Sequence, residues 1–270
     1  MTRDRGGAEY RNIRIALAYD GTPYLGWQVQ PQGATVQSVL QGALKLITGE
    51  QVVVKGSGRT DAGVHAMGQV ANFLTRSSMP PDAFARALNA VLPPTIAVLD
   101  ADEVDLRFDA RYSALGKCYR YRVFNSRIGS PFEINRSWHV TASLGIESMR
   151  ASAGMLIGSI DFSSFRGQGC VAASPVRNVT RCEVVTEGTV VTFELEADGF
   201  LRHMVRNIVG TLVEVGRGRF STGDFRAIIA ARDRTKAGVT APPHGLYLVR
   251  VDYPGRTGPT ARPGTCGPMR

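Results

Sequence analysis

The segment from Gly56 to His65 carries the densest group of glycine and reactive residues in this 270-residue chain, in the order Gly-Ser-Gly-Arg-Thr-Asp-Ala-Gly-Val-His. Asp61 stands two residues after Arg59 in this segment. A carboxylate that stays ionised near neutral pH can act as a covalent nucleophile, and a nearby guanidinium favours that ionised form. A glycine-framed loop holds such a carboxylate in a fixed position. The pattern therefore predicts that Asp61, with an arginine partner, is a nucleophile of the kind that acts at a sugar C1′.

Other chemistries that use glycine-rich loops do not fit this segment. A dinucleotide-binding fingerprint requires a small residue and a helix where Asp61 and Gly63 stand. A P-loop requires Gly-Lys-Ser/Thr, and the segment contains no lysine. A nucleophile elbow requires Gly-x-Ser-x-Gly, and Ser57 lacks those flanking glycines. The alternative to a catalytic loop is a solvated glycine turn with an incidental acidic residue.

A second candidate site follows Phe200, in the sequence Leu-Arg-His-Met-Val-Arg-Asn-Ile. In a helix, Arg202 and Arg206 are one turn apart and lie opposite the apolar residues, with His203 and Asn207 beside them. This spacing predicts a basic, hydrogen-bonding helix face that binds phosphates. The alternative is an ordinary solvated helix face.

Aromatic and basic residues alternate in a third segment, Lys117-Cys-Tyr-Arg-Tyr-Arg. In a strand, Tyr119 and Tyr121 share one face, and Arg120 and Arg122 share the other. Aromatic side chains interleaved with arginines suit base stacking combined with phosphate binding. For Tyr121, a position in the core of a sheet is the alternative. None of the four histidines has the spacing of a metal ligand, so we expect no metal site.

Periodicity predicts the element order β-α-β-β-α-β for the first half of the chain. The first strand is expected to be half-buried, because apolar residues alternate with others along it. The expected strands cover residues 13–19, 51–55, 69–74 and 95–99, and the expected helices run from the Thr35 cap to Gly49 and from Pro80-Pro81 to Pro93-Pro94.

The second half is expected to repeat this order with one extra helix. Its expected strands cover residues 119–124, 181–186, 190–197 and 246–251, its helices cover 146–156, 201–215 and 225–232, and a hairpin turns at Glu187-Gly188. The order predicts an α+β fold made of two tandem split-βαβ halves of the ferredoxin or RRM type. We expect their mostly antiparallel sheet to have helices on one face and to leave a concave cleft.

This organisation divides the chain into four parts. We expect a mobile N-terminal tail over residues 1–11, an N-terminal α+β domain over 12–112 that carries the Asp61 loop, a C-terminal α+β domain over 113–253, and a mobile C-terminal tail over 254–270. Arginines in both tails are available for weak phosphate contacts.

Composition narrows the class of protein. Apolar residues make up 43% of the chain and charged residues 20%, which excludes disorder for most of it. The net charge of +9 favours a polyanionic partner, nucleic acid first. No stretch approaches the ~20 consecutive apolar residues of a membrane span, and no apolar signal segment opens the chain. The four cysteines have no Cys-x-x-Cys spacing, so we expect reduced thiols and a cytoplasmic location.

The segment Gly58-Arg-Thr-Asp-Ala-Gly-Val-His resembles the signature of the tRNA pseudouridine synthase A family. Further ordered matches extend the resemblance over residues 13–253. They are Tyr24-Leu-Gly-Trp-Gln, Gly68-Gln-Val, Lys117-Cys-Tyr-Arg-Tyr, Asp161-Phe-Ser-Ser-Phe, Pro175-Val-Arg-Asn, His203-Met-Val-Arg-Asn-Ile-Val-Gly, Asp233-Arg-Thr and Gly245-Leu-Tyr-Leu.

The resemblance implies that the protein isomerises uridine to pseudouridine at positions 38, 39 and 40, in the anticodon arm of tRNA. It also implies a homodimer that needs no cofactor or metal and holds RNA in its cleft. By position, Asp61 resembles the catalytic aspartate, Arg59 the motif arginine, Arg206 the arginine that pairs with the nucleophile, Tyr119 the tyrosine that stacks on the flipped base, and Leu246 a residue of the base pocket. We expect Arg202 and His203 to contact the substrate.

This reaction breaks the N1–C1′ bond, turns the uracil and joins C5 to C1′. The sequence leaves open whether Asp61 attacks C1′ or uracil C6, and Tyr119 is a candidate acceptor of the C5 proton by position alone. The alternative function is a tRNA-binding protein on the same fold without chemistry, since fold alone does not imply activity.

Overall fold

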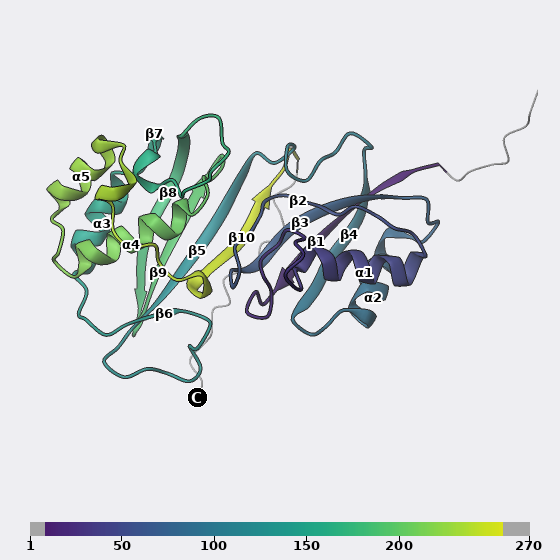
Figure 1. Cartoon of the computed structure of the whole chain (residues 1–270), viewed down its shortest axis with the longest axis horizontal. Helices are drawn as coiled ribbons and strands as arrows, with labels where there is room; N and C mark the ends of the chain where they lie inside the picture. The colour runs from purple at the N-terminus through teal and green to yellow at the C-terminus, as the bar shows by residue number, and fades with distance from the viewer. Residues whose placement is uncertain (1–8, 256–270) are drawn as a thin grey trace, which may run out of the picture. The chain divides into compact units, whose positions relative to one another are not determined.

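The computed structural model describes residues 9–255 (Figure 1). They form two compact units, which are described separately: residues 9–114 with 250–255 make the first unit, and Leu115–Val249 make the second. The last strand, β10 (Leu246–Asp252), runs from the second unit into the first. Residues 1–8 and 256–270 hold most of the two tails expected to be mobile, including Cys266, and lie outside the described residues.

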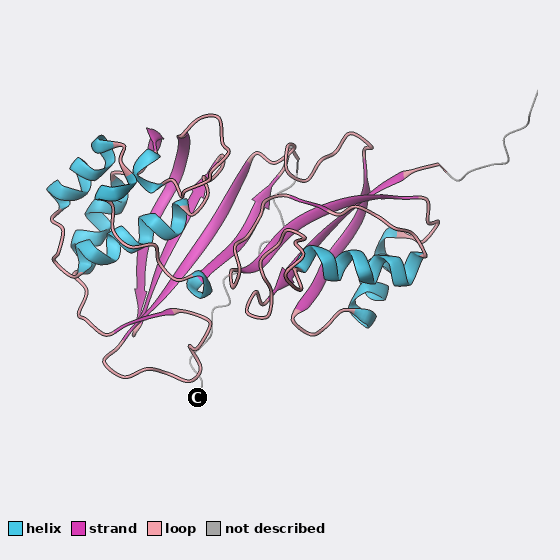
Figure 2. Ribbon diagram, viewed as in Figure 1, coloured by secondary structure: helices cyan, strands magenta, loops and turns pink. Residues whose placement is uncertain are grey.

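The first unit has the predicted order β-α-β-β-α-β. Its elements are β1 (Arg11–Tyr19), α1 (Val36–Thr48), β2 (Lys55–Gly56), β3 (His65–Thr75), α2 (Pro81–Val91) and β4 (Ile96–Val104). Strand β1 lies between β4 and β3, β2 pairs with the other edge of β3, and every one of these pairs is antiparallel. The two helices pack on this sheet (Figure 2).

The strand β1 differs from its prediction in two ways. It begins at Arg11, whose guanidinium binds the carboxylate of Glu103 at 2.7 Å, so the expected tail is shorter than residues 1–11. Its polar side chains are also buried, although alternation predicted a half-exposed strand. Arg14 is paired with Asp102, and the Asn12 amide donates to backbone carbonyls of the loop that follows β4. Strand β4 and the loop after it therefore supply partners for these polar side chains of β1.

Both helices of the first unit begin and end as predicted. Thr35 caps α1 by accepting a hydrogen bond from the backbone N–H of Ser38, and Gly49 ends the helix in the left-handed conformation. Helix α2 begins at Pro81, and the prolines that follow Leu92 prevent its extension.

The predicted strand over residues 51–55 is wrong in length, since β2 contains only Lys55 and Gly56. The backbone of Val54 is engaged by helix α1 instead. The side chain of Gln37 donates to the Val54 carbonyl at 2.8 Å, and Gln41 accepts from its N–H at 3.3 Å. These side-chain bonds replace the strand ladder, and β-branched composition alone gives no sign of them.

The second unit contains more strands than predicted. Its elements are β5 (Gly116–Asn125), β6 (Trp138–Val140), α3 (Ile146–Gly154), β7 (Gly158–Asp161), β8 (Val176–Glu187), β9 (Val190–Ala197), α4 (Met204–Gly216), α5 (Thr222–Ala231) and the first part of β10, with short 3-10 turns at Ser163–Phe165, Arg234–Lys236 and Pro243–Gly245. The predicted order is therefore wrong by β6 and β7, which are too short to produce a periodic pattern.

Strand pairing in the second unit is mostly antiparallel, as predicted. Strand β9 lies between β5 and β8, and β7 pairs with the outer edge of β8, all antiparallel, whereas the short β6 pairs in parallel with β5. The hairpin at Glu187-Gly188 is confirmed: β8 and β9 meet there, and Gly188 has a φ of 57°. Helices α3, α4 and α5 lie together beside these strands (Figure 2). No helix among residues 9–255 has the length and apolar character that crossing a bilayer requires.

Candidate active site

The glycine-rich loop that carries Asp61 connects β2 to β3 in the first unit, and its first residues are fixed by the second strand. The backbone N–H of Ser57 donates to the Val70 carbonyl at 2.7 Å, and its hydroxyl donates to Gln69 at 2.6 Å. The side-chain amide of Gln69 in turn donates to the Gly58 carbonyl at 3.0 Å. The polar atoms of the loop are thus bonded inside the protein, which argues against a solvated turn.

The middle of the loop is held through Thr60, the residue before Asp61. Its hydroxyl lies 2.8 Å from the hydroxyl of Tyr19, in a buried contact, and its carbonyl accepts from the N–H of Trp27 at 3.0 Å. Burial raises the pKa of Tyr19 to about 12, so this phenol keeps its proton at physiological pH. Beyond Asp61, the N–H of Val64 donates back to the Asp61 carbonyl at 3.1 Å and closes a turn.

The segment around Trp27 connects this loop to helix α1. The first N–H groups of α1 donate to the carbonyls of Gly26 and Trp27, both at 3.1 Å. Groups at a helix N-terminus lack partners within the helix, so these bonds fix the segment to α1. Asp61 is therefore supported on both sides by buried backbone contacts. Asp61 itself is half-buried, and Arg59, two residues earlier, is exposed.

A substitution at Gly26 tests how rigidly the contacts with Thr60 hold the Asp61 loop. Gly26 and Gly49 both have positive φ values, +90° and +76°, so an alanine at either position costs about 1–2 kcal/mol of stability. A Cβ at Gly49 meets no atom within 4 Å, whereas at Gly26 it would lie 2.5 Å from the Thr60 carbonyl oxygen. We expect Gly26→Ala to cost more stability than Gly49→Ala in urea unfolding. It should also accelerate amide exchange at Trp27 and Val64, which Gly49→Ala leaves unchanged. Equal effects of the two variants would contradict a locked loop.

The remaining predicted site residues lie in the second unit. Tyr119 is on β5, 8% exposed, with its ring edge-on to Phe200 at 5.0 Å between centroids. Tyr121 lies on the same face, as predicted, and Arg120 and Arg122 on the opposite face are partly exposed. Tyr121 is a core residue: it is fully buried, its hydroxyl donates to the Pro242 carbonyl at 2.7 Å, and burial raises the pKa of its phenol.

Arg206 lies in the first turn of α4 and is half-buried. Its Nε donates to the Ala241 carbonyl at 2.7 Å, and the N–H of Ala241 donates to the Arg206 carbonyl at 3.1 Å. The side chain is therefore fixed by a hydrogen bond at its guanidinium group. Leu246, at the start of β10, is buried, as a residue that lines an apolar pocket would be.

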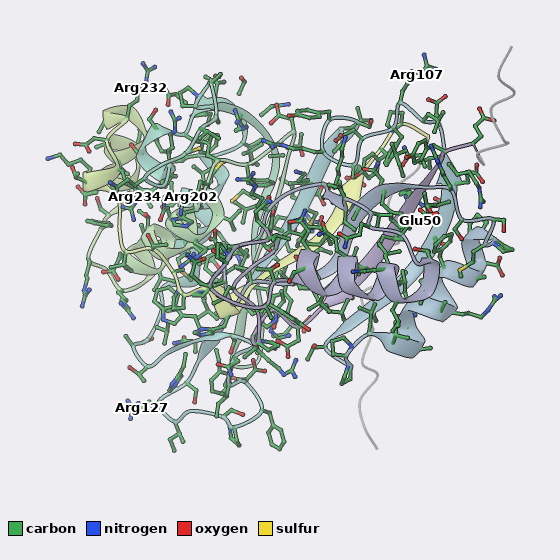
Figure 3. The ribbon with its side chains drawn as sticks, turned by 45° about the vertical axis from the view of Figure 1, so that its right-hand side comes forward. Glu50, Arg107, Arg127, Arg202, Arg232 and Arg234 are labelled. Atoms are coloured by element: carbon green, nitrogen blue, oxygen red, sulfur yellow. The ribbon has the colours of Figure 1, made fainter. Side chains whose placement is uncertain are left out.

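The predicted basic helix face is wrong, because α4 begins at Met204 rather than at residue 201. His203 has a left-handed backbone, with a φ of 60°, and Arg202 precedes it, so these two residues do not share a helical face with Arg206. Arg202 is exposed, and its Nη1 donates to the Gln168 carbonyl at 3.0 Å (labelled in Figure 3). Arg202 thus keeps the exposure that phosphate binding requires, outside the helix.

Asn207, predicted to lie beside these arginines on the solvated face, is fully buried. Its amide donates to the Phe165 carbonyl at 2.9 Å, and its oxygen accepts from Thr240 at 2.7 Å and from Arg234 at 3.1 Å. Sequence reasoning assigned no role to Thr240 or Arg234. The only signal was the segment Asp233-Arg-Thr among the family matches, which gives no indication of what Arg234 contacts.

The structure therefore places the predicted residues in two groups. Asp61 and Arg59 belong to the loop of the first unit, and Tyr119, Arg202, His203, Arg206 and Leu246 belong to the second. Within the second unit, Arg206 and Tyr121 bind successive carbonyls, those of Ala241 and Pro242. In residues 9–255, no three His, Cys, Asp or Glu side chains are grouped in a way that could hold a metal ion.

The chain matches a known family over most of its length. The profile described as tRNA pseudouridine synthase matches residues 15–113 and 153–254. The chain belongs to this family. The matched segments contain the Asp61 loop, helix α4 and Leu246, whereas Tyr119 lies between them.

Similar proteins agree with this family. The tRNA pseudouridine synthase A of Acetivibrio thermocellus is 48% identical over 243 residues, which cover 90% of this chain and 100% of that protein. The tRNA pseudouridine synthase A of Myxococcus xanthus is 48% identical over 251 residues, 93% of this chain and 94% of that protein. The solved structure of a Cbf5-Nop10-Gar1 complex is only 17% identical, with a TM-score of 0.37, over 87% of this chain and 48% of that chain.

Proposed function

We propose that this member of the tRNA pseudouridine synthase family isomerises uridine to pseudouridine at positions 38, 39 and 40 in the anticodon arm of tRNA, without a cofactor. The observation that carries the proposal is the match of the family profile across both units, including the loop on which Asp61 is held. The 48% identity to tRNA pseudouridine synthase A from two organisms supports the choice of substrate.

Asp61 is the proposed nucleophile, at either C1′ or uracil C6. A nucleophilic carboxylate has to be ionised and held still, and the bonds of Ser57 and Thr60 fix the loop on both sides of Arg59. Arg206 is the proposed guanidinium that favours the charged form of Asp61 in the reacting complex. Its Nε bond to Ala241 gives it a fixed direction.

Tyr119 is the proposed stacking partner of the uracil. A paired base must leave the duplex before it can react, at a cost of a few kcal/mol, and stacking on an aromatic ring returns about 1–3 kcal/mol. Tyr119 is also the candidate acceptor of the C5 proton. Leu246 supplies apolar contact to the base. Arg202 and His203 are the proposed contacts to tRNA outside the reacting uridine, and the exposure of Arg202 suits a phosphate contact.

The finer description of the fold and the assembly belongs to the same proposal. We infer two tandem split-βαβ halves with a concave RNA-binding cleft, and a cytoplasmic homodimer. The strand neighbours β4, β1, β3 and β2 in the first unit support the split-βαβ assignment, since the returning strand β3 lies between the strands that α1 connects. The net charge of +9 supports a nucleic-acid partner.

The alternative function is a tRNA-binding protein that has lost its chemistry. The wild-type protein decides between the two when it is incubated with an unmodified tRNA transcript, without cofactor or metal. We expect pseudouridine in the anticodon arm, detected by carbodiimide modification and primer-extension mapping, with uridines outside the arm as internal controls. Tight binding of the transcript without any pseudouridine would favour the alternative. Pseudouridine only outside positions 38–40 would overturn the proposed site.

A further inference from the structure

We propose that Thr240, Asn207 and Arg234 are positioning residues that aim the guanidinium of Arg206, so that they set the rate of the chemical step rather than the affinity for tRNA. The inference rests on the proposed function, in which Arg206 acts on the reacting carboxylate. All four residues belong to the second unit, as do the hydrogen-bond partners Phe165, Ala237 and Ala241.

The centre of this network is the amide of Asn207. It is fully buried, and each of its two polar atoms is bonded: Nδ2 donates to the Phe165 carbonyl at 2.9 Å, and Oδ1 accepts from the Thr240 hydroxyl at 2.7 Å and from Arg234 Nη2 at 3.1 Å. A buried amide that lost these partners would carry an uncompensated desolvation cost. The orientation of Asn207 is therefore set by Thr240 and Arg234.

The segment of residues 237–242, named the strap below, joins this network to Arg206. Thr240 directly precedes Ala241, just as Arg206 directly precedes Asn207. The pair Asn207–Thr240 is bonded through side chains, and the pair Arg206–Ala241 is bonded twice, by Arg206 Nε to the Ala241 carbonyl and by the Ala241 N–H to the Arg206 carbonyl. These are two successive connections between α4 and the strap. If the first is lost, the Ala241 carbonyl that accepts from Arg206 Nε is held by fewer bonds to α4.

Arg234 makes the network stiff. Its Nη2 also donates to the Thr240 hydroxyl at 3.0 Å, and its Nη1 donates to the Ala237 carbonyl at 3.4 Å. The cation therefore contacts Asn207 and two residues of the strap. Burial lowers the pKa of Arg234, but an arginine stays charged at physiological pH. A partly buried charge is stable only when it is hydrogen-bonded. The bonds of Arg234 therefore favour the observed position of the strap over others in which these bonds are broken.

The consequence for Arg206 follows from the shape of its side chain. A guanidinium is planar and rigid, so a bond that holds Nε also restricts the directions of both Nη groups. Arg206 then presents these groups in one orientation before substrate arrives, with no reordering during the reaction. Misplacement of a catalytic group by 1 Å costs up to about 10²-fold in rate. Removal of the Thr240 hydroxyl is therefore expected to misplace the Arg206 guanidinium and to lower the rate of the chemical step.

The kinetic test compares three variants in single-turnover and steady-state assays on a tRNA transcript. We expect Thr240→Val to lower kcat about 10- to 100-fold with KM unchanged, and Thr240→Ser, which keeps the hydroxyl, to restore it. The matched control is Thr235→Val. Within the described residues its hydroxyl donates to the neighbouring Asp233 carboxylate at 2.7 Å, away from Asn207 and Thr240, so kcat should stay at the wild-type value. An increase in KM alone, or no rescue by serine, would overturn a positioning role.

A spectroscopic test needs no activity. In arginine-selective ¹H–¹⁵N spectra, the Nε–Hε signal of Arg206, assigned by its loss in Arg206→Lys, should exchange faster with solvent in Thr240→Val but not in Thr235→Val. An unchanged Arg206 signal in Thr240→Val would refute the network, whether or not tRNA is modified. A wild-type protein that binds but does not convert tRNA would instead refute the proposed function, while the spectra still report whether Thr240 holds Arg206.

Discussion

Asp61→Asn is expected to abolish pseudouridine formation while leaving the protein folded and able to bind tRNA. The amide has nearly the shape of the carboxylate but lacks its charge and its nucleophilic oxygen, so no covalent step can begin. Loss of a residue with this role lowers kcat on the order of 10⁴-fold or more. Affinity should change little, because tRNA binding comes mainly from phosphate contacts with lysines and arginines. The measurement is the yield of pseudouridine over time, with tRNA affinity from filter binding.

The matched control for this prediction is Asp105→Asn in the same unit. Asp105 is exposed, and the hydrogen bond from Arg107 holds the pKa of its carboxyl below the usual value, so the change removes the same charge from an ionised aspartate. An exposed pair of this kind contributes little to stability, so the control should fold and turn over normally. Full yield from Asp61→Asn would end the nucleophile hypothesis, and equal loss in both variants would point to a general effect of charge.

Local signals predicted the fold where the cause of the structure is itself local. The Thr35 cap, the prolines that bound α2 and the Glu187-Gly188 turn act through neighbouring residues, and the structure confirms each of them. The errors occur where a distant segment supplies the partner. The side chains of Gln37 and Gln41 form hydrogen bonds with the Val54 backbone in place of a neighbouring strand. No periodicity in residues 51–55 indicates these side-chain bonds.

The same distinction explains what sequence revealed of the site. The spacing of Arg59 and Asp61 within glycines identified the loop, because the loop is a continuous segment. The helical face was wrong because His203 adopts a left-handed backbone and α4 begins after it. Helical spacing places Asn207 beside the arginines on the polar face, whereas the structure buries it. Its burial depends on Thr240 and Arg234, which are 33 and 27 residues away along the chain.

Arg206→Ala and Arg202→Ala remove the same charge from the same segment, and we expect them to fail in different ways. Arg206 is half-buried and fixed by Ala241, so its loss should lower kcat about 10²–10³-fold, the cost of removing one preorganised donor, with a small change in tRNA affinity.

Arg202 is exposed, and its Nη1 donates to the Gln168 carbonyl, an arrangement that suits a phosphate contact. Its loss should weaken binding and reduce the slope of log affinity against log salt by about 0.7–0.9, with kcat kept. The measurements are single-turnover rates at saturating enzyme and affinities at several salt concentrations. If Arg206→Ala weakened affinity alone, with the same loss of salt slope, Arg206 would be a second phosphate contact. The charge that supports Asp61 would then have to come from another residue.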